Sequence, residues 1–156
     1  MFAPDLSLEN AIKFSRFDRD HLLSTMSPHP FHLEGLEWPT AEHYYNAQLA
    51  GSAESAGKIR AAASAIDAYK LGKSWFLRKR RNWKNLRRVL MTRALYTKAM
   101  AYPEVRRFLL DSGEERIVET ALYDHFWGIG RDLRGENTLG KVWMDIRRKI
   151  REDGDS

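Results

Sequence analysis

The sequence predicts an α+β fold that is predominantly helical, in one compact domain with a small N-terminal β-hairpin. Three observations support this class. From residue 40 onward, apolar residues recur at helical spacing between capping residues. Residues 31–38 alternate between apolar and polar side chains around a turn. The 156 residues contain no linker-like stretch and are enough to bury one core. We therefore expect a single domain over residues 1–156, with loosely held ends.

The first half of the chain is expected to contain the hairpin and three helices. FHLEGLEW (31–38) turns at Glu34-Gly35, a pair suited to a tight hairpin. Thr40, after Pro39, is a suitable N-cap for a helix that stops at Gly51. Two short helices then follow: one starts at Ser52 or Ser55 and runs to about Ala63, and the other runs from Ser64 to Gly72.

The second half is expected to be helical apart from one long loop. Asn82 caps a helix that runs to about Ala101, and Pro103 and Gly113 frame the next one. Residues 114–122 are expected to form a further short helix. YDHFWGIGRDLRGEN (123–137) has the composition of a loop, and Thr138 to about Arg151 forms the last helix.

Composition narrows the classes of function. The net charge of +5 favours a polyanionic or phosphorylated partner. The absence of cysteine excludes disulfides and thiol chemistry. No apolar run reaches the length of a membrane span, and the first residues do not resemble a signal peptide, so a cytoplasmic protein is expected. The five histidines form no H-E-x-x-H pattern, and no nucleotide-cofactor fingerprint is present, so we expect neither a metal site nor a cofactor.

Three stretches combine residue types that carry chemistry, and each also has a purely structural interpretation. WPTAEHYY (38–45) places Glu42 in the first turn of a helix, where an acid can complement the helix dipole or face a ligand. RKRRNWKNLRR (78–88) is either a solvated helix entry or a phosphate-binding segment, and its Trp83 either packs or stacks on a base. The long loop 124–137 contains glycines that permit close approach of a ligand.

These stretches occur together in one known family. WPTAEHYYNAQ (38–48), NW (82–83), YDHFWGIG (123–130), NTLG (137–140) and MDIR (144–147), with LSTMSPHPFHLEG (23–35) before them, resemble the NADAR or YbiA-like family in order and spacing over about residues 14–150. The resemblance implies an α-rich α+β fold and N-glycosidase activity on a ribose that bears phosphate. Family substrates are riboflavin-biosynthesis intermediates or ADP-ribosylated guanine, so nucleic acid is a possible partner.

The resemblance also implies a set of site residues. Glu42 and Asp124 are expected to be catalytic, with their general acid and general base roles left open. Arg80 and Arg81 are expected to hold phosphate. The residues expected to bind substrate are Trp38, His43, Tyr44, Tyr45, Trp83, Trp127, Gly128, Gly130, Arg131 and Asn137.

The sequence departs from the family pattern at three places. Leu49 stands where the family commonly has lysine, Ile129 stands where W-G-x-G often carries aspartate, and residues 23–26 read LSTM in place of L-S-N-F. An amine of residue 49 is therefore not available to attack the ribose. The alternatives to an N-glycosidase are a catalytically lapsed module that binds ADP-ribose or a nucleotide, and a nucleic-acid-binding protein that uses the basic run. The sequence leaves the N-ribosyl substrate and the oligomeric state open.

Overall fold

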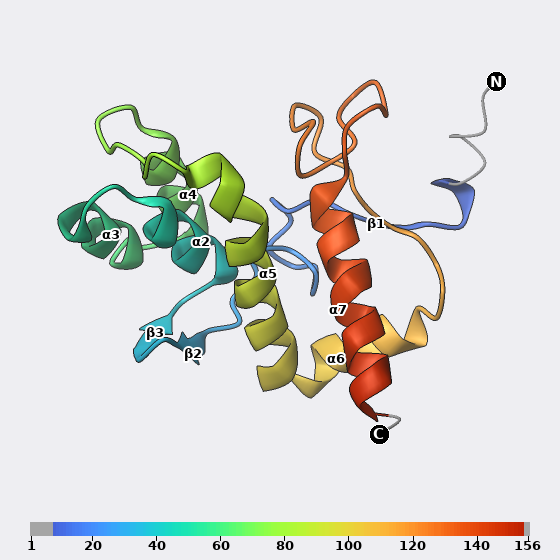
Figure 1. Cartoon of the computed structure of the whole chain (residues 1–156). Coiled ribbons are helices and arrows are strands. Elements are labelled where there is room, and N and C mark those ends of the chain that lie inside the picture. Colours follow the sequence, from blue (N-terminus) through green and yellow to red (C-terminus); the bar gives the residue numbers. More distant parts are fainter. Residues whose placement is uncertain (1–7, 155–156) are drawn as a thin grey trace. The chain divides into compact units, whose positions relative to one another are not determined.

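The computed structural model describes residues 8–154 of the chain (Figure 1). Its residues fall into two units: one holds Thr25–Ala101, and the other joins the described residues up to Ser24 with those from Tyr102 onward. Both units are built mainly of helices with short strands. The prediction of an α+β, predominantly helical fold is therefore confirmed.

The unit formed by Thr25–Ala101 begins with the expected hairpin. β2 (Phe31–Leu33) pairs antiparallel with β3 (Leu36–Trp38), and the register aligns Leu33 with Leu36. This leaves Glu34 and Gly35 as a two-residue turn, with φ of 56° and 81°. Positive φ at both turn positions is the geometry that follows the twist of the two strands.

Three serine or threonine caps start the helices after the hairpin, as the sequence predicts. The N-cap side chains accept a hydrogen bond from the backbone N–H three residues later and satisfy one free donor of each helix. Thr40 starts α2 (Ala41–Leu49), Ser52 starts α3 (Ala53–Arg60) and Ser64 starts α4 (Ala65–Lys73).

α5 (Trp83–Ala101) completes this unit. Figure 1 shows α2 with α3, α4 and α5 around it, and each of them packs on α2. Every residue of α2 except Gln48 is buried. A helix buried nearly all round lies in the core of its unit, so its polar side chains must find partners there.

The second unit contains a parallel strand pair that the sequence did not predict. β1 (Ile12–Phe14) pairs with β4 (Ile117–Glu119). The helix expected at 114–122 is therefore wrong. Ile117 and Val118 are β-branched and fully buried, and the ladder partners that select the strand lie more than a hundred residues earlier in the chain.

The remaining elements of this unit follow the expected order. α6 (Pro103–Asp111) starts at the predicted proline, and Gly113 follows it with a φ of 60°. Residues 120–137 contain neither helix nor strand, which agrees with the loop predicted at 123–137 but not with the helix predicted to reach residue 122. α7 (Thr138–Gly154) packs on β4 and α6. Across residues 8–154, no helix has both the length and the apolar character needed to span a membrane.

Candidate active site

Glu42 is a fully buried carboxylate held by two side-chain donors. The Thr25 hydroxyl donates to Oε1 at 2.6 Å, and the Asn46 amide donates to Oε2 at 2.6 Å. The backbone N–H of Glu42 also donates to the Thr25 carbonyl at 3.0 Å. An acid that only complements a helix dipole gains its small benefit at the surface, whereas burying a carboxylate is costly unless donors compensate. The arrangement therefore favours a specific task for Glu42 over the helix-dipole interpretation.

The packing of α4 supports the orientation of Asn46. A Cβ added at Gly72 would lie 2.1 Å from Asn46 Oδ1, so only glycine lets α4 approach this amide. Asn46 Nδ2 also donates to the Glu42 carbonyl at 2.8 Å, which is the i−4 position of the same helix. The Asn46 amide, which donates to Glu42 Oε2, is thus positioned by its own helix α2 and by the close packing of α4.

His43 lies in the helix beside Glu42 with both ring nitrogens engaged. Nδ1 is 2.8 Å from the Thr40 hydroxyl, and Nε2 is 3.0 Å from the Ala62 carbonyl. Since a carbonyl can only accept, Nε2 must carry a proton. Burial lowers the pKa of His43, against smaller raising effects of the Ala62 hydrogen bond and the Glu42 charge. These contacts are those of a satisfied core histidine.

Trp38 and Tyr44 pack the hairpin against α2. Their rings meet edge to face at 5.2 Å, and Trp38 Nε1 donates to the Leu33 carbonyl at 3.0 Å. Both side chains are buried, as is Tyr45. Burial raises the pKa of Tyr44, while a hydrogen bond from Arg93 to its hydroxyl opposes the shift. Their contribution to substrate binding stays a prediction.

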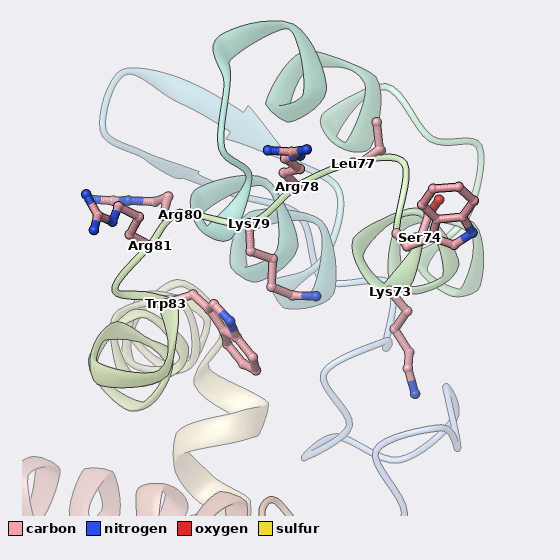
Figure 2. Close-up of a pocket in the computed structure, with 9 residues that line it drawn as sticks. Lys73, Ser74, Leu77, Arg78, Lys79, Arg80, Arg81 and Trp83 are labelled. Carbon is pink, nitrogen blue, oxygen red and sulfur yellow. The ribbon is translucent and has the colours of Figure 1, made fainter.

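The basic segment that starts at the end of α4, residues 73–83, lines a hollow of about 540 Å³ (Figure 2). Trp83 is half-buried there, and three cations lie over its ring at 5.1–5.7 Å: Lys79, Lys84 and Arg87. Lys79 Nζ donates to the Gly72 carbonyl at 2.8 Å. Burial, aided by the charge of Lys73, lowers the pKa of Lys79.

Arg80 and Arg81 are both exposed. Figure 2 shows their side chains extending together, away from the direction that Lys79 and Trp83 take. Arg80 also fixes the segment to the end of α2, because its backbone N–H donates to the Leu49 carbonyl at 2.8 Å. Leu49 itself is buried, so a lysine at this position would carry its amine into the interior.

In the other unit, Asp124 organises the start of the glycine-containing loop. Its Oδ1 accepts from the backbone N–H groups of Phe126 and Trp127, at 3.1 and 2.7 Å. Its Oδ2 pairs with Arg16 at 3.3 Å, and the Arg16 guanidinium lies 5.8 Å from the Trp127 ring centre. Trp127 is buried. Because Asp124 contacts both Arg16 and the Trp127 backbone, and Arg16 lies near the Trp127 ring, the three residues form one connected group.

Glu119, which sequence reasoning missed, is a second fully buried carboxylate. It accepts from the backbone N–H groups of Arg16 at 2.8 Å and Ala121 at 3.0 Å. Burial raises the pKa of Glu119, although these hydrogen bonds oppose the shift. A Cβ at Gly128 would lie 2.0 Å from its Oε1, so Gly128 is needed for the packing of this carboxylate. The available sequence signal was an acid next to two apolar β-branched residues.

Other loop residues predicted to bind substrate also have structural partners. Asn137 accepts from the Glu119 N–H at 2.9 Å and donates to the Ile117 carbonyl at 2.9 Å. Gly130 has a φ of 72°, which few other residues adopt. Arg131 donates to the Tyr123 hydroxyl at 2.9 Å on the exposed side of the loop.

The expected site residues thus divide between the two units. The unit formed by Thr25–Ala101 carries Glu42, the aromatic residues of 38–45, and the two arginines predicted to hold phosphate, Arg80 and Arg81. The other unit carries Asp124 with the loop residues. Within residues 8–154, no group of three or more His, Asp or Glu side chains is arranged to hold a metal ion.

Comparison with known proteins gives consistent matches over most of the chain. An N-glycosidase from Nostoc punctiforme is 38% identical over 131 residues, which is 82% of this chain and 84% of that protein. The N-glycosidase YbiA from Escherichia coli is 31% identical over 127 residues, covering 81% of this chain and 79% of that protein. A riboflavin biosynthesis protein from Vibrio vulnificus is 30% identical over 146 residues, covering 93% of this chain but 40% of that protein.

The fold leads to the same group. The NMR structure of E. coli YbiA matches with a TM-score of 0.83 at 30% identity, covering 92% of this chain and 86% of that one. The family model described as NADAR domain matches residues 6–151. The buried acid of α2, the tryptophan that begins α5 and the W-G-x-G loop all lie inside that range. The chain therefore belongs to the NADAR domain family.

Proposed function

We propose that this chain is an N-glycosidase that hydrolyses the bond between a base or amine and C1 of a phosphorylated ribose. The observation that carries the proposal is the Glu42 carboxylate, fully buried and held by the Thr25 hydroxyl and the Asn46 amide. Relatives that match most of the chain are named N-glycosidases. A carboxylate held in a fixed orientation suits this reaction, because it can stabilise the positive charge that develops on the ribose.

The reaction places opposite demands on the two ends of the bond. As the C1–N bond breaks, positive charge develops on the ribose ring, and the leaving nitrogen must gain a proton. A carboxylate can stabilise that positive charge or take a proton from the attacking water, and preorganised charge of this kind is a large part of enzymatic rate enhancement. We assign the task at the ribose to Glu42, and the protonation of the leaving nitrogen to Asp124.

The remaining assignments concern substrate binding. Arg80 and Arg81 are exposed guanidinium groups that suit phosphate, which they can bind through two parallel hydrogen bonds. Half-buried Trp83 offers a ring to the base or sugar. Trp127 is buried, so its part in binding is to hold the loop that follows Asp124. The substrate is either a ribosylamino-phosphate intermediate of riboflavin synthesis or an ADP-ribosylated guanine.

The competing function is a module that binds ADP-ribose or a nucleotide without cleaving it. One observation favours it: Leu49, buried at the end of α2, replaces the lysine that is common in the family. If that amine is needed for turnover, this chain would retain only binding.

The test is incubation with both candidate substrates, with mass spectrometry to detect ribose 5-phosphate or ADP-ribose. We expect release by the wild type and a loss of about 100-fold or more in Glu42→Gln, the range typical of general acid–base catalysis. Glu54→Gln is the matched control, since Glu54 is also an acid in the first turn of a helix but is exposed.

The outcomes separate the two functions. No product from either substrate, together with saturable binding of ADP-ribose, would contradict the enzyme and support the lapsed module. Turnover by Glu42→Gln at the rate of Glu54→Gln would remove Glu42 from the mechanism.

A further inference from the structure

The segment from α4 to the first turns of α5 combines dense positive charge with exposed aromatic rings. No acidic residue occurs between Asp67 and Glu104. The stretch from Lys70 to Arg88, both included, contains nine lysines and arginines. Because the stretch itself contains no carboxylate, its charges add to a positive field along the segment. Such a field attracts a polyanion.

Trp75 and Phe76 lie within this charge and are turned toward solvent. Their side chains are 80% and 75% exposed, and their rings stack on each other with centres 4.1 Å apart and planes 27° apart. The Ser74 hydroxyl accepts from the Phe76 backbone N–H at 3.3 Å and helps to form the turn that presents them. Large aromatic rings exposed in this way leave apolar area uncovered, which commonly marks an interaction site.

Trp75 borders the hollow of about 540 Å³ described above, and Phe76 stacks on Trp75. Its lining contains Trp75 and Trp83 together with cationic side chains, and Figure 2 shows Lys79 and Trp83 extending in the same direction. The hollow is shallow and largely open to solvent, so a strand can lie across it. The lining therefore offers ring faces for bases and cations for phosphates in one place.

We infer that this aromatic–basic surface binds single-stranded nucleic acid. It consists of Lys73, Trp75, Phe76, Arg78, Lys79 and Trp83. Guanidinium groups bind phosphates of any sequence, and aromatic rings stack on any unpaired base, so the two together recognise a strand without reading its sequence. In a duplex, the base faces are already stacked and cannot meet Trp75 and Phe76. A single strand is therefore bound more tightly than a duplex.

An anionic membrane is the other polyanion that attracts basic residues with aromatic neighbours. Membrane-binding segments present an apolar face that enters the lipid, with cations on the opposite face. Here the cations and the tryptophans line one shallow hollow, so the rings are not separated from the charges as they are in such a segment. The surface therefore fits a flexible strand better than a bilayer.

The experiment measures the fluorescence anisotropy of a labelled oligothymidylate of about 12 nucleotides, a length within the usual site size of single-strand binders. The full chain should bind it saturably, and the affinity should fall as salt rises from about 50 to 200 mM. The double variant Trp75→Ala/Phe76→Ala should weaken binding by about fivefold or more, while Trp75→Phe, which keeps a ring, should lose little.

The charge contribution is tested separately. Arg78→Ala should reduce the slope of log Kd against log salt by about 0.7, the value for one phosphate contact with a single strand. Arg107→Ala removes the same charge from an exposed position of α6 and should leave the slope unchanged. Equal effects of the two variants would indicate only attraction by net charge and would overturn the inference.

Two further arms complete the test. Equal affinity for a duplex of the same length would refute single-strand recognition, as would binding that survives loss of both rings. Sedimentation with phosphatidylserine vesicles but no oligonucleotide binding would assign the surface to membranes. The oligothymidylate carries no ADP-ribosyl group. A chain that binds it but cleaves no N-ribosyl substrate therefore contradicts only the proposed function, and one that cleaves without binding it contradicts only this inference.

Discussion

Replacing Gly128 with alanine should destabilise the protein through Glu119. The new Cβ would lie 2.0 Å from Glu119 Oε1 and 3.0 Å from the Glu119 carbonyl oxygen, so the carboxylate must move. It is fully buried and accepts from the backbone N–H groups of Arg16 and Ala121. Each of these two buried donors costs about 1–3 kcal/mol when it is left without a partner, so we expect a loss of roughly 2–6 kcal/mol in the free energy of unfolding.

Urea denaturation measures this loss directly, and a thermal melt should show a fall of roughly 4–24 °C for a chain of this size. Gly57→Ala is the matched control, because a Cβ at Gly57 meets nothing within 4 Å and the residue lies inside α3. That variant should be stabilised by up to about 1 kcal/mol through helix propensity.

A double-mutant cycle identifies the cause. In a Glu119→Ala background the obstructing carboxylate is gone, so adding Gly128→Ala should cost less than about 1 kcal/mol. If Gly128→Ala alone unfolds within about 0.5 kcal/mol of the wild type, the ordinary range for a neutral surface change, the packing role of this glycine is refuted. An equal cost in both backgrounds would also refute it.

Three other predictions follow from single residues. Trp83→Phe should weaken substrate binding in calorimetry with little change in melting temperature, since Trp83 is only half-buried; a large loss of stability at unchanged affinity would make it a core residue. Leu49→Lys should raise turnover or yield an adduct that borohydride traps, at some cost in stability because Leu49 is buried; a folded variant with neither would show that this scaffold does not use the lysine. Burial lowers the pKa of Lys98 to about 7, so above that pH the folded chain binds fewer protons than the unfolded chain. Its contribution to the unfolding free energy should therefore rise toward pH 10 by up to about 1.4 kcal/mol per pH unit. This rise should be absent in Lys98→Met when both are measured by urea denaturation, and parallel profiles would contradict it.

Local signals carried most of the fold prediction. The caps at Thr40, Ser52 and Ser64 were readable because each needs only one side chain and a backbone N–H three residues away. The turn at Glu34-Gly35 was readable for the same reason. β4 was not, because its strand conformation depends on β1, whose position in space no local pattern reveals.

The same division holds for the candidate site. The motif around Glu42 predicted that it is a site residue, but only one of the two donors to its carboxylate could be predicted from the sequence. Asn46 lies four residues on, within the same helix turn, whereas Thr25 reaches the acid from a separate segment. Glu119 was missed because a lone acid in a buried strand has no spacing pattern. One of its N–H partners, Arg16, is 103 residues away in the sequence, and the other, Ala121, lies in a loop without a motif.

The parallel pairing of β1 with β4 has a consequence for synthesis of the chain. Arg16 and Glu119, joined by a hydrogen bond at the end of this pair, are 103 residues apart. At ribosomal rates of about 5–20 residues per second, the first strand waits roughly 5–20 s for its partner to be made. Throughout that interval, the whole Thr25–Ala101 unit is completed while Ile12 and Phe14 lack their ladder. The nascent β1 strand therefore depends on protection until β4 is made, and a chain that ended before Ile117 would leave it permanently unpaired.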